Sequence, residues 1–235
     1  MKKYIRKSFY LFVILSAILL AGISFQGAQV SASIAVYADQ DVEDYKGKWV
    51  ILFSHPADFT PVCTTEFMTF AYMMGEFKAL NTELVGLSVD SIYSHIAWLR
   101  KIQELEWNGK NHLEVKFPLI EDIKMEIANK YGMIQPNQST TQAVRAVFII
   151  DPKGIIRTIL YYPISTGRNF DEIKRIILAL QKADRDAVAT PADWRPGDDV
   201  IVPTAGSCGV AKARVEANDP NMYCLDWFLC FKKEK

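Results

Sequence analysis

One cysteine of the sequence lies where a reactive thiol is expected. Cys63 follows the apolar run 49–53, which is typical of a buried strand, and falls in the first turn of a predicted helix. The unpaired N–H groups and the dipole at a helix N-terminus favour a thiolate. Thr60, three residues earlier, can place its hydroxyl beside the sulfur. A cysteine taken alone is more often an inert buried side chain, but the neighbouring prolines and Thr60 argue against that here.

Strands and helices alternate along the part of the chain that must position this thiol. Apolar runs predict strands at 49–53, 84–89, 145–150 and 155–162, and helical patterns cover 65–80, 91–105, 122–131 and 170–185. Asn169 is the predicted N-cap of the last helix. Residues 108–116 read as a polar loop. The alternation implies an α/β fold whose parallel or mixed sheet is covered on both faces.

Composition excludes several classes of protein. The 235 residues contain 27 Lys and Arg against 27 Asp and Glu, so no broad basic field exists for nucleic acid. Four cysteines are too few for a disulfide-dense secreted scaffold. Three histidines without ligand spacing give no reason to expect a metal, and nothing in the sequence requires a cofactor.

The two ends of the chain differ from its middle. Basic residues within the first seven positions precede an uncharged, apolar stretch from Phe9 to Phe25, and small residues follow at 30–32. Residues 1–32 are therefore predicted to be a cleaved signal peptide or an uncleaved membrane anchor, with the remainder exported or facing outward. A wrongly assigned start is a further possibility. Residues 190–235 are Pro-rich and aperiodic, which predicts an extended C-terminal arm rather than a second domain.

The stretch 53–66, FSHPADFTPVCTTE, resembles the active site of peroxiredoxins of the AhpC/TSA family, whose pattern is Pro-x-x-x-Thr/Ser-x-x-Cys. The His-Pro pair and the long arm resemble the peroxiredoxin-6-type branch of archaea and bacteria. Similarity continues through GLSVD at 86–90, SHIAW at 94–98, RAVFIID at 145–151 and YP-x-x-x-GRN at 162–169. The resemblance implies a thioredoxin-like domain at 33–189, a peroxidase activity and a cytoplasmic location.

The resemblance also implies roles for individual residues. Cys63 would be the peroxidatic cysteine that becomes a sulfenic acid, Arg145 would bind the substrate, and Pro56 and Thr60 would complete the pocket. The chemistry agrees, because attack on a peroxide requires an ionised, shielded thiol flanked by donors, and arginine is always charged. Arg145 opens a core strand, where a cation is otherwise unfavourable.

Further residues are expected around these. Arg168 and Glu66 could add a second layer of hydrogen bonds, although Arg168 could equally be a surface residue. His55 is expected to position the pocket rather than to act as a base. By the resemblance, Cys224 resolves the sulfenic acid as a disulfide with Cys63 of a neighbouring chain, and Cys230 pairs with it along the arm.

The resemblance implies a peroxide substrate, a dithiol reductant such as thioredoxin, and homodimers that assemble into higher rings, a decamer in the family. One departure is visible. The N-terminal β-hairpin of the family, with its Gly-x-x-Ala-Pro-x-Phe motif, is missing before Trp49.

Two other functions compete with a peroxidase. A thioredoxin-like disulfide oxidoreductase is disfavoured because the position three residues after Cys63 is Glu66, which leaves no Cys-x-x-Cys pair. A membrane-tethered redox sensor with impaired catalysis fits the front of the chain and the missing hairpin. The intact Pro56, Thr60, Cys63 and Arg145 argue against that sensor.

Overall fold

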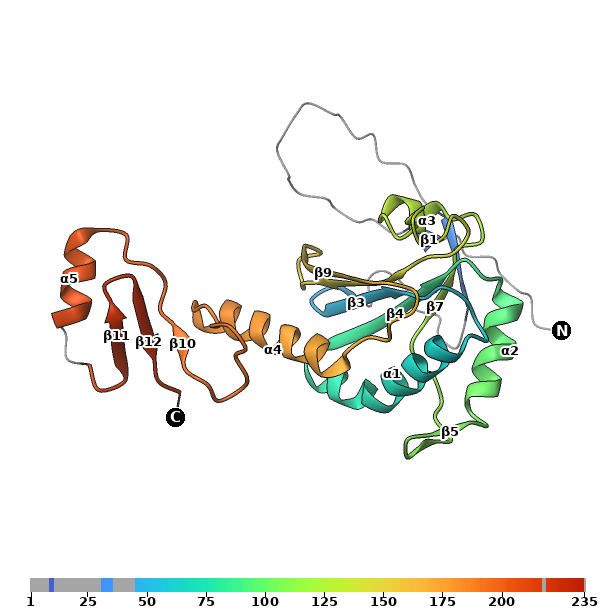
Figure 1. Cartoon of the computed structure of the whole chain (residues 1–235), viewed down its shortest axis with the longest axis horizontal. Coiled ribbons are helices and arrows are strands. Elements are labelled where there is room, and N and C mark those ends of the chain that lie inside the picture. The colour runs from blue at the N-terminus through green and yellow to red at the C-terminus, as the bar shows by residue number, and fades with distance from the viewer. Residues whose placement is uncertain (1–8, 11–30, 36–44, 217–218, 235) are drawn as a thin grey trace, which may run out of the picture. The chain divides into compact units, whose positions relative to one another are not determined.

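The computed structural model describes residues 9–10, 31–35, 45–216 and 219–234 (Figure 1). The chain divides into two compact units, Met1–Arg168 and Asn169–Lys235. Most of the predicted signal or anchor segment lies outside the described residues. Within them, no helix combines the length and the apolar character that a bilayer-spanning helix needs.

The first unit is built on a seven-stranded mixed sheet with the strand order β1-β2-β7-β4-β3-β8-β9. The strands are β1 (Phe9–Tyr10), β2 (Ser31–Ala35), β3 (Trp49–Ser54), β4 (Thr82–Ser88), β7 (Leu119–Glu121), β8 (Arg145–Ile150) and β9 (Ile156–Tyr162). Strands β3, β4 and β7 are parallel, and the other neighbours pair antiparallel. Although the family's hairpin motif is missing from the sequence, an antiparallel pair, β1 and β2, extends the sheet beyond β7.

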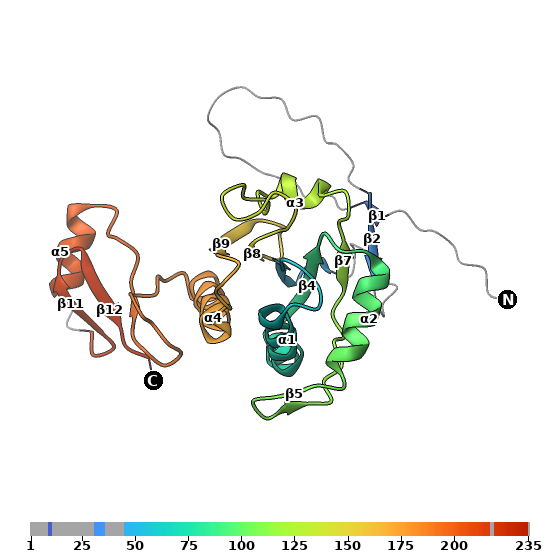
Figure 2. The same cartoon turned by 45° about the vertical axis from the view of Figure 1, so that its right-hand side comes forward.

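Both faces of the sheet are covered, as the alternation of elements predicts. Helices α1 (Pro61–Ala79) and α2 (Ile92–Ile102) lie on one face, and α3 (Glu126–Lys130) lies on the other (Figure 2). Successive residues of β3 show the alternation. Phe53 stacks on Phe70 of α1 at 4.3 Å between ring centroids, whereas Leu52 belongs to the cluster that contains Ile127 of α3.

Between β3 and β9, four elements differ clearly from the sequence expectation. Helix α1 begins at Pro61 rather than at 65, because proline suits the first helical position. The expected loop at 108–116 overlaps a hairpin of β5 (Glu106–Trp107) and β6 (Lys110–Asn111), whose turn has positive φ at Asn108 and Gly109. Strand β7 was not expected, since three residues are too few to show a period. Helix α3 is shorter than 122–131 because Met125 before it is left-handed, with φ 57°.

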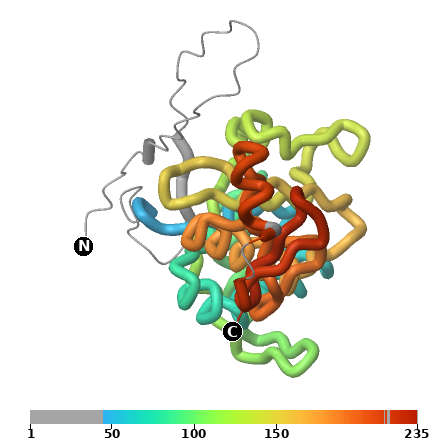
Figure 3. The backbone as a smooth tube through the Cα atoms, turned by 90° about the vertical axis from the view of Figure 1, so that its left-hand side faces the viewer, coloured from blue at the N-terminus to red at the C-terminus, as the bar shows by residue number. Residues whose placement is uncertain are grey.

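The second unit, which runs from orange to red in Figure 3, contains α4 (Phe170–Asp186). A small sheet with the order β10-β12-β11 follows it (Figure 1). Asn169 caps α4 as predicted, because its side chain accepts a hydrogen bond from the Glu172 amide. The segment 190–235 contains β10 (Val200–Ile201), α5 (Cys208–Glu216), β11 (Met222–Asp226) and β12 (Leu229–Lys232). These pieces are too short to leave a clear period in the sequence, which is why the segment reads as irregular.

Candidate active site

Cys63 lies in the first turn of α1, immediately after the loop that leaves β3. Thr60 is the N-cap residue, with extended backbone, and Pro61 opens the helix. The Cys63 side chain is free of any disulfide and has 0% of its surface exposed. The sulfur is thus placed among the unpaired amides of a helix N-terminus and away from bulk water, as the sequence predicts.

Arg145 reaches this sulfur from the start of β8. The antiparallel register, in which Phe53 faces Val147, brings the beginning of β8 beside the end of β3. Arg145 Nη1 donates to Cys63 Sγ at 3.2 Å, while Nε and Nη2 both donate to the Ile164 carbonyl at 3.1 and 2.9 Å. The guanidinium is buried and held from two sides. Arg145 therefore does not face solvent, although it lies at a strand end.

Glu66, one turn after Cys63, joins two guanidinium groups. Its Oε2 accepts from Arg145 Nη1 at 2.8 Å and from Arg168 Nη1 at 2.7 Å, and its Oε1 accepts from the Arg168 amide at 2.9 Å. Arg168 Nη2 also donates to the carbonyls of Ser54 and Ala146. The expected second layer of hydrogen bonds is present, and Arg168 is a buried residue rather than a surface one.

The electrostatics of this cluster follow from its composition. Burial lowers the pKa of Arg168, and the Glu66 carboxylate opposes that shift. The cluster contains two guanidiniums but only one carboxylate, so one positive charge has no carboxylate to neutralise it. The Cys63 sulfur lies beside this excess positive charge, because Arg145 Nη1 donates to it.

Pro56 and Thr60 lie in the loop before the helix. Pro56 is buried, and Thr60 is partly buried. The Thr60 hydroxyl donates to the Ala57 carbonyl at 2.8 Å, so its proton is used to close the loop. Its oxygen still has a lone pair with which it can accept a hydrogen bond from a substrate.

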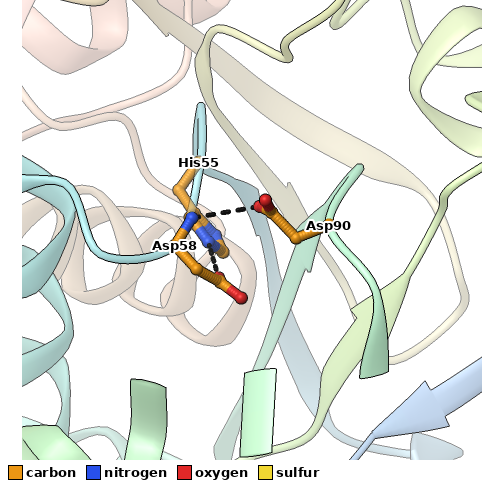
Figure 4. A group of neighbouring side chains, drawn as sticks. All are labelled: His55, Asp58 and Asp90. Atoms are coloured by element: carbon orange, nitrogen blue, oxygen red, sulfur yellow. Dashed lines mark hydrogen bonds and ion pairs between the residues drawn. The ribbon is translucent and has the colours of Figure 1, made fainter. Parts of the chain in front are cut away.

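His55 is fully buried at the end of β3 and is held by Asp58 through Nε2 at 3.0 Å. Burial lowers the pKa of His55, which keeps the ring neutral at neutral pH. Figure 4 shows His55 and Asp58 beside Asp90, whose carboxylate accepts from the Asp58 amide at 3.0 Å. Within the described residues these three side chains place potential metal-ligand atoms within 4.8 Å of one another. Their hydrogen bonds to one another account for that closeness.

Comparison with known proteins identifies the family. The family model described as "AhpC/TSA family" matches residues 29–159, and the model described as "C-terminal domain of 1-Cys peroxiredoxin" matches residues 179–216. The chain is a peroxiredoxin of the AhpC/TSA family. The resemblance that the sequence motifs suggest is therefore confirmed.

Related peroxiredoxins cover most of the chain. The peroxiredoxin of Methanosarcina mazei is 65% identical over 193 residues, which are 82% of this chain and 88% of that relative. The peroxiredoxin of Aquifex aeolicus is 52% identical over 201 residues, 81% of this chain and 87% of the relative. A solved yeast mitochondrial 1-Cys peroxiredoxin is 40% identical, with a TM-score of 0.70, over 82% of this chain and 89% of that one. The fold is that of thioredoxin-like peroxiredoxins, and the protein is a thiol peroxidase, which reduces peroxides with a thiol reductant.

The other cysteines of this peroxiredoxin lie in the second unit. Cys224 of β11 and Cys230 of β12 face each other in the strand register and are joined by a disulfide. Cys208, at the start of α5, is free and exposed. The structure thus brings together Cys63, Arg145, Glu66 and Arg168, and it places Cys224 with Cys230.

Sequence reasoning missed several side chains around the peroxiredoxin site. Asp58 lies between His55 and His95, and Trp98 donates to Thr64, the residue after Cys63. The signal for two of them was present. His95 and Trp98 lie three residues apart in a predicted helix, at the spacing that puts two side chains on one helical face.

Proposed function

We propose that Cys63 is the peroxidatic cysteine of this thiol peroxidase and that Arg145 binds both its thiolate and the peroxide. The observation that supports this most directly is the uncompensated positive charge of the buried Arg145–Glu66–Arg168 cluster beside Sγ. That charge favours the thiolate before reaction. During reaction the same guanidinium can donate to the oxygens on which negative charge develops.

The chemical step follows from these positions. The Cys63 thiolate attacks one peroxide oxygen, so an S–O bond forms as the O–O bond breaks. The other oxygen leaves as hydroxide, or as alkoxide from an organic peroxide, and takes a proton to become water or an alcohol. The sulfur is oxidised to a sulfenic acid and the peroxide is reduced. Pro56 and Thr60 border the space in which the peroxide would lie.

Resolution is proposed to use the C-terminal pair. The Cys224 thiol would condense with the sulfenic acid of Cys63 on a neighbouring chain, releasing water and forming a disulfide. The Cys230 thiol would then displace Cys63 from that disulfide. This exchange restores Cys63 and yields the Cys224–Cys230 disulfide, which is the pairing seen in β11 and β12. A dithiol protein such as thioredoxin would reduce it.

Assembly belongs to the same proposal. Resolution between chains requires at least a homodimer, and dimers of this family can associate into rings. The solved yeast 1-Cys peroxiredoxin carries the description of a thiol resolving mechanism via glutathione/thioredoxin systems. Resolution by an external thiol is therefore the second candidate, and it would make Cys224 and Cys230 dispensable.

The test uses reduced full-length protein, one equivalent of hydrogen peroxide, rapid alkylation and mass spectrometry. Cys63→Ser should consume no peroxide. Cys224→Ser should reduce one equivalent and stop at the sulfenic acid, whereas Cys230→Ser should accumulate a disulfide between Cys63 and Cys224. Retained turnover in Cys63→Ser would refute the nucleophile. In a second assay with excess peroxide and a dithiol reductant, unchanged turnover of Cys224→Ser would assign resolution to an external thiol.

A further inference from the structure

Helix α2 contacts the active-site segment on both sides of Cys63, at Asp58 and at Thr64. His95 Nδ1 lies 2.7 Å from Asp58 Oδ2, and Trp98 Nε1 donates to Thr64 Oγ1 at 3.2 Å. Both side chains are buried and lie three residues apart, so they share one face of the helix. Asp58 precedes Cys63 and Thr64 follows it, so that face of α2 spans the whole active-site turn.

The contact at Asp58 fixes the loop before the helix. The Asp58 carboxylate lies between His55 and His95, and its amide donates to Asp90, which in turn accepts from Ser88 Oγ at 2.7 Å (Figure 4). Burial would raise the pKa of Asp58, but the hydrogen bonds from the two histidines outweigh it and lower it to about 2. The ionised Asp58 carboxylate thus ties the loop to α2, and the Asp58 amide ties it to Asp90 after β4.

A strained residue follows this anchor. Phe59 has φ 55°, in the left-handed region that a bulky side chain rarely adopts, and 58% of its side chain is exposed. Such a conformation persists where the residues on each side are held. Asp58 is held by α2, and the Thr60 hydroxyl is bonded to the Ala57 carbonyl.

The contact at Thr64 holds the first turn of α1. The Thr64 hydroxyl accepts from Trp98 and donates to the Thr60 carbonyl at 2.8 Å, and the Thr64 amide donates to the same carbonyl at 3.0 Å. These bonds close the turn that contains Cys63. The Trp98 ring is itself fixed, because it packs against Phe67 at 4.6 Å and against His55 at 5.1 Å between centroids.

We propose that His95 and Trp98 are positioning residues, which clamp the turn around Cys63 from α2 and keep its sulfur aligned with Arg145. The inference rests on the proposed role of Cys63 as nucleophile. The clamp contacts neither the sulfur nor a substrate in the described bonds. Its effect passes through Asp58 and Thr64, which hold the two sides of the turn.

Loosening the clamp should change two reactions of Cys63 in opposite directions. Attack on hydrogen peroxide needs the sulfur aligned with Arg145, and a displacement of about 1 Å can slow a positioned reaction by about 10²-fold. Alkylation by iodoacetamide also uses the thiolate, but it needs no alignment of a peroxide with Arg145 and is limited by access to the sulfur, which is fully buried while the turn is closed. A loosened turn should therefore react more slowly with peroxide and faster with iodoacetamide.

The variants separate position from simple destabilisation. His95→Ala removes the donor to Asp58, whereas His95→Asn keeps an N–H at the place of Nδ1 and should recover most of the wild-type rate. Trp98→Phe keeps a ring in the core and removes only the donor to Thr64, and it should slow peroxide attack by about 2- to 10-fold, as expected for one hydrogen bond. Tyr93→Ala is the control, because Tyr93 lies on α2 with 81% of its side chain exposed and should change neither rate.

Both rates are measured on reduced full-length protein at the Cys63 peptide by rapid quench and mass spectrometry. His95→Ala is expected to react with peroxide about 10- to 100-fold more slowly and with iodoacetamide several-fold faster. Equal slowing of both reactions, unchanged rates, or failure of His95→Asn to recover would overturn the clamp. If His95→Ala does not fold, the peroxide and iodoacetamide rates of His95→Asn and Trp98→Phe still test the clamp. Peroxide consumption by Cys63→Ser would instead refute the proposed function.

Discussion

Glu66 offers the most direct test of the buried charge cluster. In Glu66→Gln the side chain keeps its shape but loses its negative charge and one of its acceptor oxygens. An amide oxygen at the place of Oε2 can still accept from both guanidiniums, but the NH₂ group then faces the Arg168 backbone N–H, from which Oε1 accepts in the wild type. Arg145 and Arg168 then remain buried with no carboxylate between them.

The size of the effect follows from burial. Removing one partner of a buried ion pair costs about 3–5 kcal/mol, because an uncompensated charge stays out of water. For a protein of this length each kcal/mol lowers Tm by about 2–4 °C, so Glu66→Gln should melt about 6–20 °C lower. On the proposed role of Cys63, its thiolate compensates part of this charge. The loss should therefore be larger, by about 0.5–3 kcal/mol, when Cys63→Ser is also present.

The assay is urea and thermal unfolding of the reduced protein, followed by circular dichroism for wild type, both single variants and the double variant. Glu83→Gln is the matched control, because Glu83 pairs with Lys48 at 3.0 Å on a partly exposed surface. That pair should contribute at most about 1 kcal/mol. A loss at Glu66 no greater than that at Glu83 would show that the cluster is not electrostatically coupled. If Glu66→Gln lowered the free energy of unfolding equally in the wild type and in Cys63→Ser, the sulfur would not be electrostatically coupled to the cluster.

Three further outcomes are expected. Arg145→Met should slow the reaction of reduced protein with hydrogen peroxide by about 10²-fold or more, measured in a single turnover, and an unchanged rate would contradict its role at the sulfur. Asp58→Asn should lower stability by about 2 kcal/mol at pH 6. Because the folded pKa of Asp58 is lowered to about 2 from 3.8, this gap should close as the pH falls from about 4 toward 2, and a pH-independent gap would contradict the ionised anchor. Ala187→Gly should raise stability by up to about 1 kcal/mol, since Ala187 ends α4 with φ 50°, and a lower Tm would contradict that reasoning.

The sequence was sufficient for the residues whose environment is local. Cys63 could be placed at a strand-to-helix junction because a continuous apolar run predicts a strand before it. Two prolines, Pro56 and Pro61, then mark the loop and the start of the helix that contains it. Asn169 could be identified as a cap for the same reason, since capping involves only neighbouring residues. Strand β7 has three residues and gives no period, so its place between β2 and β4 could not be predicted.

The rest of the site depends on contacts between segments far apart in the chain. Arg145 and Glu66 are separated by 79 positions, and Arg168 and Glu66 by 102. Their types suggested an ion pair, but only the antiparallel register of β8 on β3 makes it possible. The spacing of His95 and Trp98 shows a shared helical face but not its partner, and Asp58 has no signal at all, because a buried carboxylate between two histidines looks like an ordinary polar residue in the sequence.

The cluster and the clamp hold Cys63 in different ways. Arg145 contacts the sulfur itself, and the single carboxylate of Glu66, shared by two guanidiniums, leaves a positive charge there for a thiolate to neutralise. A second carboxylate would stabilise the buried arginines but would remove that charge. The clamp acts through position, because His95 and Trp98 bond to Asp58 and Thr64 rather than to the sulfur. The positive charge left by a single carboxylate therefore lowers the stability of the cluster and, on the proposed mechanism, raises the reactivity of the thiol. The alignment of the sulfur is set separately, by the contacts from α2.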